Sequence, residues 1–220
     1  MAMVSFDIYC PEINYSFPMV FIKGTEDATY TFGVNEKAEI YVSDFFISAF
    51  QVTQQLWEYI MYGNPSHFIG KNRPVENVSF NDISNENGFL YKLNLRFGEK
   101  YKLIFRLPSE TEWEYAARGG EHWKDGFLFS GSDDINAVAW YEQNSGLYND
   151  PEIIAKLKNH AKGTETHNVG EMAANQLGLF DMCGNVWEWC ADYFQIDINK
   201  IPKNGTPYLE ETPNRVLRGG

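Results

Sequence analysis

The chain has 220 residues, of which 44% are hydrophobic and 16% aromatic, enough large apolar surface for one sizeable core. Its 30 acidic side chains outnumber 18 basic ones, and the resulting formal charge of -12 repels phosphate backbones, which excludes nucleic acid as the expected partner. No stretch approaches the ~20 apolar residues that cross a bilayer, so no membrane partner is expected. These totals indicate a globular protein of one domain.

The start of the chain and the cysteine count bear on where the protein is located. Residues 1–7 lack a basic region followed by an apolar one, so they do not have the pattern of a secretory signal. The three cysteines, Cys10, Cys183 and Cys190, leave one unpaired under any disulfide scheme, which suits a reducing compartment. A cytoplasmic location is therefore predicted, with Cys183 and Cys190 as small buried apolar side chains.

The first quarter of the chain has the pattern of short β-strands. Apolar runs predict strands at 17–23, 30–32, 40–42 and 45–47, separated by turn residues. A helix is then predicted after Thr53, which can cap it. Its core-facing side chains are Leu56, Trp57, Ile60 and Met61, and Gly63-Asn64-Pro65 ends it.

Two more helices and one more strand are predicted in the middle of the chain. Ser79 can cap a helix that runs towards Arg96, although Gly88 weakens it. Residues 101–106 have the composition of a strand. Ser109 and Glu112 have the spacing of a capping box, which predicts a short helix through Ala117. Arg106 and Arg118 bracket this helix and can pair with its carboxylates.

Beyond Gly120 the chain is expected to be mostly loop, because glycine, asparagine and aromatic residues alternate there without a sustained period. Residues 146–165 form a polar surface insertion that can hold one helical patch at 151–161. Trp187, Trp189, Phe180 and Tyr193 could line a groove, but aromatic side chains in a loop-rich protein more often supply core, and that interpretation is favoured.

Several motifs stand in the order and spacing of one known family. In the first half they are Val52-Thr53-Gln54 before Trp57, Asn64-Pro65-Ser66 and the run 73–80. The run from Arg106 to Gly120 follows, with the sequence Arg-Leu-Pro-Ser-Glu-Thr-Glu-Trp-Glu-Tyr-Ala-Ala-Arg-Gly-Gly. The last two are the run 175–189, which contains Gly-Asn-Val-Trp-Glu-Trp, and Arg218-Gly219-Gly220. On these residues the chain resembles the formylglycine-generating enzyme, or sulfatase-modifying-factor, domain family. The match covers nearly everything from Phe17 to Gly220.

The resemblance implies the fold class: α+β, an irregular, loop-rich single domain related to the C-type-lectin fold, with little regular secondary structure. Residues 1–16 are then an N-terminal extension and 17–220 the family domain, C-terminally incomplete, with the surface insertion at about 146–165.

The resemblance also bears on catalysis. Oxidases of the family convert a cysteine of a sulfatase to formylglycine with oxygen and a copper ion held by two cysteines, and those cysteines lie downstream of the Arg-Gly-Gly motif. Here that motif is Arg218-Gly219-Gly220. Cys183 and Cys190 do not match the family's pair, and Cu(I) needs thiolate ligands. No catalytic residue is assigned, copper is expected only if a downstream cysteine pair exists, and the chain as given is expected to be catalytically silent.

A calcium site is implied at Asp181, Gly184, Val186 and Glu188, where the family takes side-chain oxygens from the first and last positions and backbone carbonyls from the middle two. Hard-cation chemistry supports this assignment, because a tight loop offers carboxylates and carbonyls at short range. In the alternative, Asp181 caps a turn and Glu188 faces solvent. Ca2+ is therefore the one cofactor expected by resemblance.

Two functions remain open at the level of the sequence. The first is an oxidase-family protein that, in full length, oxidises a cysteine of a sulfatase-like partner. The second is a non-catalytic ligand-binding or display domain on the C-type-lectin-like scaffold, like the targets of diversity-generating retroelements. The form of the Gly-Asn-Val-Trp-Glu-Trp segment is closer to bacterial domains for which neither role is established. A protein or peptide is the expected partner in both cases.

Overall fold

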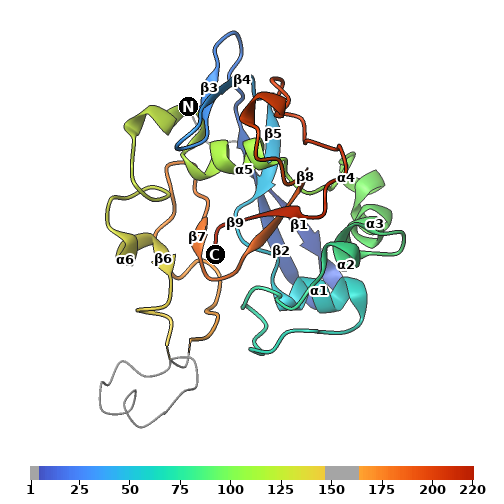
Figure 1. Ribbon diagram of the computed structural model, residues 1–220. Coiled ribbons are helices and arrows are strands. Elements are labelled where there is room, and N and C mark those ends of the chain that lie inside the picture. Colours follow the sequence, from blue (N-terminus) through green and yellow to red (C-terminus); the bar gives the residue numbers. More distant parts are fainter. Residues whose placement is uncertain (1–4, 147–163) are drawn as a thin grey trace.

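The computed structural model describes residues 5–146 and 164–220 (Figure 1). An antiparallel sheet in the order β1-β2-β5 consists of β1 (Ser5–Cys10), β2 (Tyr15–Ile22) and β5 (Phe45–Ser48). Because side chains alternate along a strand, Val20 and Ile22 point to one face of the sheet, and Ile8 and Phe17 point to the other. The sheet thereby separates two hydrophobic clusters.

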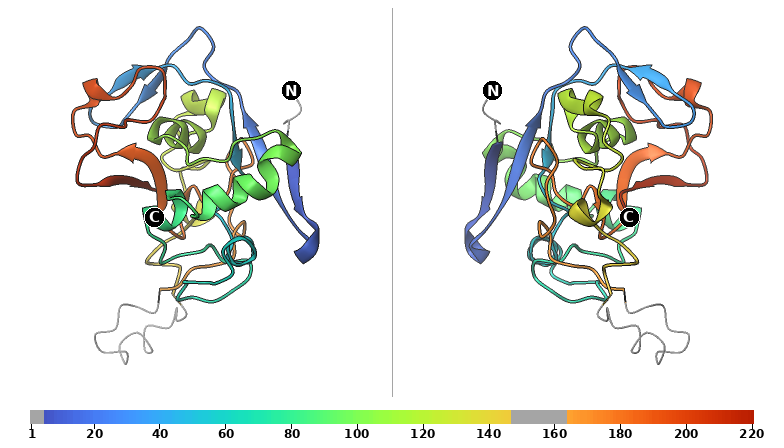
Figure 2. Two further views of the ribbon diagram at one scale, coloured as in Figure 1. Left: turned by 90° about the vertical axis from the view of Figure 1, so that its right-hand side faces the viewer. Right: turned by 90° about the vertical axis from the view of Figure 1, so that its left-hand side faces the viewer.

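The first cluster lies on the Val20 face and contains elements from both the early and the late parts of the chain. Those that contribute to it are β3 (Tyr30–Phe32), β4 (Ala38–Ile40), α5 (Glu110–Ala117), β8 (Glu188–Tyr193) and β9 (Arg215–Arg218). Tyr30, Tyr115 and Leu179 are almost fully buried in it. Figure 2 shows the β1–β2 hairpin on one side of the molecule and the β8–β9 pair on the other, with helices between them.

The second cluster lies on the Phe17 face and is covered by helices. These are α1 (Gln54–Met61), α2 (Phe80–Ser84), α3 (Phe89–Leu93), the π-helical turn η2 (Asn94–Gly98) and α4 (Glu99–Tyr101). Trp57 of α1 stacks on Phe89 of α3 with ring centroids 4.9 Å apart. The helices therefore supply the wall that faces the sheet.

The rest of the described chain is loop with short elements, as the sequence predicts. These are η1 (Pro11–Ile13), η3 (Gly120–Asp125), α6 (Ile135–Val138), β6 (Ala139–Trp140), β7 (Cys183–Gly184) and η4 (Ile198–Lys200). Among the described residues no helix has the length and apolar character of a membrane span. The structure is an irregular, loop-rich α+β domain related to the C-type-lectin fold.

The predicted insertion at 146–165 falls almost wholly on residues outside the described ranges, and so does the helical patch predicted at 151–161. Its two ends are close together, because Gly146 and Thr164 form a β-bridge. The boundary expected between an extension at 1–16 and the domain from Phe17 falls inside β2, and β1 pairs with β2 from Ser5 to Cys10.

Helix caps are the most accurately predicted local features. Thr53 caps α1 by accepting a hydrogen bond from the Leu56 amide, and Ser109 begins α5 with both bonds of a capping box. The helix predicted from Ser79 towards Arg96 is wrong as one element, because it is broken between α2 and α3, where Gly88 becomes the N-cap of α3.

The strand predicted at 101–106 is also wrong. The Asn94 side chain donates to the Phe105 carbonyl and accepts from the Phe105 amide, each at 2.8 Å. Lys102 adopts a left-handed conformation with φ of 55° that ends α4. The backbone of this segment is therefore satisfied by a side chain rather than by a neighbouring strand.

Candidate functional site

Helix α5 fixes the position of the segment before it through one acid. The Glu112 carboxylate accepts from the Ser109 amide at 2.8 Å and from both terminal nitrogens of Arg106 at 2.7 Å. A two-pronged contact of this kind holds both partners in one geometry. Arg118 pairs with Glu114 at 3.4 Å, so both arginines that bracket the helix pair with its carboxylates as predicted.

The last acid of α5, Glu114, connects segments from the two ends of the chain. Glu114 is 4% exposed and accepts from the Tyr30 hydroxyl at 2.8 Å and from the Gly33 amide at 2.9 Å. Its other oxygen accepts from Arg218, which also lies near Glu110. Burial and the Glu114 charge raise the pKa of Tyr30. The Arg-Gly-Gly motif is thereby held against α5.

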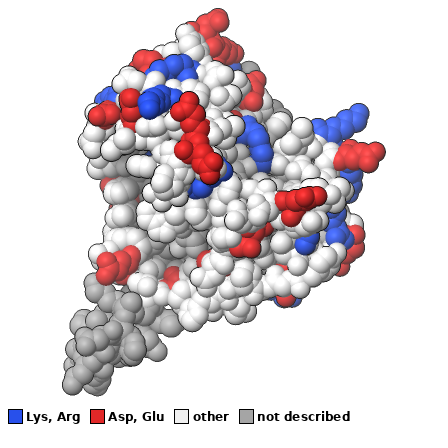
Figure 3. All heavy atoms as spheres, turned by 45° about the vertical axis from the view of Figure 1, so that its right-hand side comes forward, with Lys and Arg blue, Asp and Glu red and all other residues white. Residues whose placement is uncertain are grey.

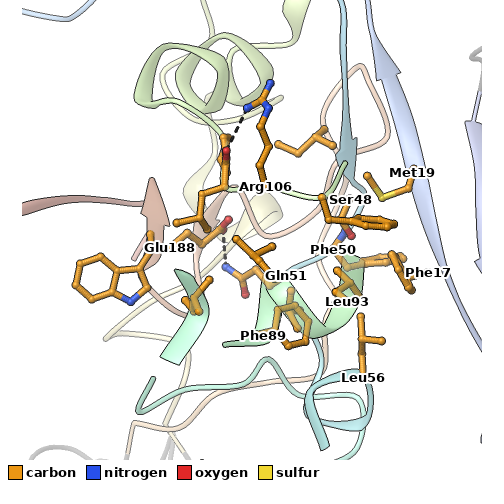
Figure 4. A pocket seen from close by; sticks show the side chains of 18 of the residues that line it. Phe17, Met19, Ser48, Phe50, Gln51, Leu56, Phe89, Leu93, Arg106 and Glu188 are labelled. Carbon is orange, nitrogen blue, oxygen red and sulfur yellow. Dashed lines mark hydrogen bonds between the residues drawn. The ribbon is translucent and has the colours of Figure 1, made fainter. Parts of the chain in front are cut away.

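The four residues of the predicted calcium site are brought together, and the side-chain amide of Gln51 lies among them. Gln51 Nε2 donates to the backbone oxygens of Asp181, Gly184 and Val186 at 3.1, 3.3 and 3.3 Å, and to Glu188 Oε1 at 2.9 Å. Figure 4 shows the Gln51 amide facing Glu188. Four oxygens from residues close in sequence therefore converge on one nitrogen.

The Asp181 side chain does not face the centre of the cluster, where the calcium assignment expected it. Its backbone carbonyl, not its carboxylate, faces Gln51, and its Oδ2 accepts from the Gly170 amide at 2.8 Å. Its Oδ1 is buried without a hydrogen-bond partner among the described residues, and so is Oε1 of Gln51. Desolvation raises the pKa of Asp181. The site thus contains two oxygen acceptors whose hydrogen-bonding capacity is unused.

The loop geometry at this site requires glycine at position 184. Gly184 has φ of 83°, and a Cβ there would come within 2.1 Å of the Trp140 carbonyl oxygen. No larger residue fits without moving β6. This close approach places the Gly184 carbonyl toward Gln51.

Glu188 is the acid with the most perturbed environment in the cluster. Its Oε1 accepts from Gln51 and its Oε2 from Trp113 Nε1 at 3.2 Å. Removal of the carboxylate from water raises the pKa of Glu188 to about 7, and the hydrogen bonds from Gln51 and Trp113 oppose this rise. The alternative in which Glu188 simply faces solvent is not what the structure has.

The oxygens of this cluster match the ligand types that Ca2+ prefers, but not the distances. Carbonyl and carboxylate oxygens are suitable donors, but Ca2+ needs them at about 2.3–2.6 Å. The cluster surrounds an amide nitrogen at 2.9–3.3 Å, so an ion would displace the Gln51 amide or turn its Oε1 inward. No group of three or more His, Cys, Asp or Glu suited to a metal occurs among the described residues. Calcium binding stays a prediction.

A cavity of about 410 Å³ lies beside this cluster, between the Phe17 face of the sheet and the helices. Gln51 and Glu188 line it on one side, and Phe46, Ile104 and Trp187 are exposed on its wall, by 38%, 86% and 63%. Figure 4 shows the apolar side chains that surround it, among them Phe17, Met19, Leu56, Phe89 and Leu93. The cavity is therefore apolar, with a polar end at Gln51.

The prediction that the aromatic residues of 180–193 are core is wrong for Trp187, which is largely exposed at the cavity. Phe180, Trp189 and Tyr193 are half-buried, and Phe180 stacks on Phe50. Trp187 differs because it follows Val186, whose carbonyl faces Gln51 and leaves the next side chain outside.

All three cysteines lie in the described part of the chain, and each is a free thiol. Cys10 and Cys190 are fully buried in different hydrophobic clusters, and Cys183 is half-buried. Burial raises the pKa of Cys10 to about 11, and it also raises the pKa of Cys183 and Cys190. Burial therefore favours the protonated form of all three thiols.

Sequence reasoning missed Gln51, Phe46 and Ile104. Gln51 stands one residue before the Val52-Thr53-Gln54 motif, and its partners are 130 to 137 residues away, so no local period marks it. An exposed Ile104 inside an apolar run looks like an ordinary strand residue. A glutamine next to a motif segment was the one available signal.

Comparison with known proteins places the chain in a family. Residues 18–220 match the model of the Sulfatase-modifying factor enzyme 1-like domain, and the chain belongs to that family. It is 32% identical over 234 residues to "Chaperone protein LppX" of Paenibacillus barcinonensis, covering 92% of this chain and 77% of that protein. It is 33% identical over 159 residues to the formylglycine-generating enzyme of Streptomyces coelicolor, covering 72% of this chain but 43% of the enzyme.

Solved structures agree with the fold. Treponema denticola variable protein 1 superposes with a TM-score of 0.76 at 26% identity, covering 99% of this chain and 87% of that one. PvdO from Pseudomonas aeruginosa has a TM-score of 0.65 at 22% identity, covering 97% of this chain and 85% of that one, and supports the fold alone.

Proposed function

We propose that this chain is a non-catalytic polypeptide-binding domain on the sulfatase-modifying-factor scaffold. The observation that carries the proposal is the open apolar cavity, with exposed Phe46, Ile104 and Trp187 at its wall. Exposed apolar surface around a cavity is the usual mark of a site for another molecule. The bound partner is a protein or peptide.

The three thiols of this chain are not the copper ligands of the family's oxidases. Those oxidases hold Cu(I) with a thiolate pair, whereas Cys10, Cys183 and Cys190 are free thiols whose pKa is raised by burial. The chain spans 43% of the length of the Streptomyces formylglycine-generating enzyme, so that enzyme's activity does not carry over from identity alone. Copper therefore has no assigned ligand in this proposal.

Two similar proteins support a binding role. The name of the Paenibacillus relative describes a chaperone, and a chaperone binds other polypeptides. The Treponema structure is described as a variable protein. Both fit the alternative of ligand binding on this scaffold, and a reducing cytoplasmic location fits the three free cysteines.

We also propose calcium as a ligand of the Gln51 cluster rather than a requirement for folding. Backbone oxygens of Asp181, Gly184 and Val186 with the Glu188 carboxylate would hold it once the Gln51 amide moves aside. The ion would neutralise Glu188 and fix the loop beside the cavity.

The function is tested with a reporter protein diluted from denaturant, whose aggregation is followed by light scattering. We expect this chain to suppress aggregation at near-equimolar ratio, whereas a folded control protein of similar mass does not. In parallel, a cysteine-containing sulfatase peptide is incubated with the chain, copper and oxygen and examined by mass spectrometry. Formylglycine in that peptide would favour the oxidase, and unsuppressed aggregation would refute the binding function.

A further inference from the structure

We infer that the cavity takes an extended polypeptide strand without acidic side chains, which adds to the free edge of β5. The inference rests on the proposed function and names its binding mode and ligand class. Strand addition of this kind combines main-chain hydrogen bonds along an edge with pockets for alternate side chains. Both requirements can be examined in the residues around β5.

The edge of β5 that faces away from β2 is unpaired. The Ala49 amide donates to the Pro18 carbonyl at 3.0 Å, and Ile47 stands opposite Val20. Because an antiparallel ladder alternates, the N–H and C=O groups of Phe46 and Ser48 point away from β2. No main-chain hydrogen bond to these groups occurs within the described residues. Two donors and two acceptors are therefore available along this edge.

The same two residues line the cavity with their side chains. A strand that pairs with Phe46 and Ser48 would place every second side chain on the cavity side, because side chains alternate along a strand. A volume of about 410 Å³ has room for a few bulky apolar groups. The edge and the cavity thus favour the same extended ligand.

The one cationic side chain among the described residues that line the cavity, Arg106, is bound to the Glu112 carboxylate. The Asp44 and Glu188 carboxylates accept from neutral groups, the Gly24 amide and the Gln51 side-chain amide. An acidic ligand side chain would therefore lose its hydration without gaining a free cation. Figure 3 shows acidic and basic side chains dispersed over one face of the molecule, with uncharged surface between them. The ligand segment is therefore free of acidic residues and rich in bulky apolar ones.

The probe is a fluorescein-labelled peptide of eight residues, with capped ends, in which valine, leucine or phenylalanine alternates with threonine. Binding is measured by fluorescence anisotropy to the wild type, to Ile104→Glu and to the matched control Ile196→Glu. Ile104 and Ile196 are 86% and 83% exposed, and only Ile104 lines the cavity. A second peptide carries the same side chains with an N-methyl group on every backbone amide.

We expect the first peptide to bind the wild type and Ile196→Glu equally, and to bind Ile104→Glu at least about tenfold more weakly. The N-methylated peptide should lose binding to a similar extent, because it cannot pair with the edge of β5. Thermal melting of both variants checks that they fold.

Other results overturn the inference and separate it from the proposed function. Equal binding of both peptides, or no effect of Ile104→Glu, excludes strand addition while leaving polypeptide binding intact. Binding of the denatured reporter without binding of the peptide would also exclude strand addition while leaving polypeptide binding intact. A dimer in light scattering that Ile104→Glu dissociates would show a second copy on this edge instead. Failure of both the peptide and the reporter to bind refutes the inference and the function together.

Discussion

The two hydrophobic clusters on either side of the sheet are closed in different ways. The first, around Tyr30 and Leu179, is sealed by polar side chains such as Glu114, which is buried and fully engaged. The second, around Phe17 and Trp57, borders a cavity whose wall exposes apolar side chains. A loop-rich domain can thus use buried hydrogen bonds to fix one half and leave apolar surface accessible in the other.

The two clusters differ because the described loops make buried hydrogen bonds over the first cluster and leave the edge of β5 unpaired at the second. Over the first cluster, the Asn175 amide donates to the Ala116 carbonyl at 2.9 Å, and its oxygen accepts from the Leu177 and Leu179 amides. One side chain thereby replaces several strand hydrogen bonds. Over the second cluster no described loop pairs with the edge of β5 at Phe46. Removal of a polar side chain from the first cluster should therefore cost much unfolding free energy. Truncation of an apolar side chain beside the cavity should cost little.

The largest effect is expected for Glu114→Ala. It leaves Arg218 without its buried partner and removes the acceptor of the Tyr30 hydroxyl, which should cost roughly 3–5 kcal/mol of unfolding free energy. Chemical denaturation measures the loss. Glu12→Ala, at an exposed acid paired with Arg96, is the control and should change little. Equal losses in both variants would contradict the sealing role of Glu114.

The next effect is a pH dependence that arises at Glu188. Its folded pKa of about 7 lies above the ordinary glutamate pKa of 4.5, so its protonation contributes fully to the stability of the folded state below about pH 4.5. That contribution is lost as pH rises through 7, and it amounts to about 3 kcal/mol. Unfolding free energies measured with a chelator should show this fall in the wild type. In Glu188→Gln the fall should be smaller, and an unchanged profile would exclude Glu188 as its source.

A smaller effect is expected for Gln51→Ala, at the boundary between the two halves. Three carbonyls and the Glu188 carboxylate lose their common donor, which should cost roughly 1–3 kcal/mol. Gln55→Ala, whose amide makes one contact at 3.5 Å, is the matched control. Calcium should raise the melting temperature of Gln51→Ala more than that of the wild type, because the amide no longer competes for the site. No shift in either protein would refute the calcium proposal.

The smallest effect is expected for Met19→Ala in the wall of the cavity. Met19 is half-buried beside space that already exists, so its truncation should cost only about 1 kcal/mol. Leu179→Ala in the sealed half should cost roughly 2–5 kcal/mol, because Leu179 is 1% exposed. Equilibrium unfolding of both variants gives the difference, and similar losses would mean that the second cluster is as tightly closed as the first.

Features of the sequence that act over a few residues were predicted well. The cap at Thr53, the capping box of Ser109 and Glu112, and the strands β2, β3 and β5 each depend on neighbours within one or two turns. The family motifs likewise indicated the fold, and the four residues of the proposed cation site do lie together.

Features that depend on distant contacts were not predicted. The segment 101–106 has a strand's composition, but the Asn94 side chain satisfies its backbone from a neighbouring helical turn. The strands β8 and β9 pair across more than twenty residues with a register shift between Trp189 and Tyr193, which a local pattern does not reveal. No sequence pattern predicts the cavity, because its walls come from segments that are far apart in the chain.

Hydrogen–deuterium exchange resolved by residue is the most direct test that polypeptides bind at the edge of β5. In the free protein the amides of Phe46 and Ser48 should exchange fast, and that of Ile47, which lies opposite Val20, should exchange slowly. Addition of the alternating peptide should protect Phe46 and Ser48 and leave Ile47 unchanged. Bound peptide with no protection at Phe46 and Ser48 would contradict the account.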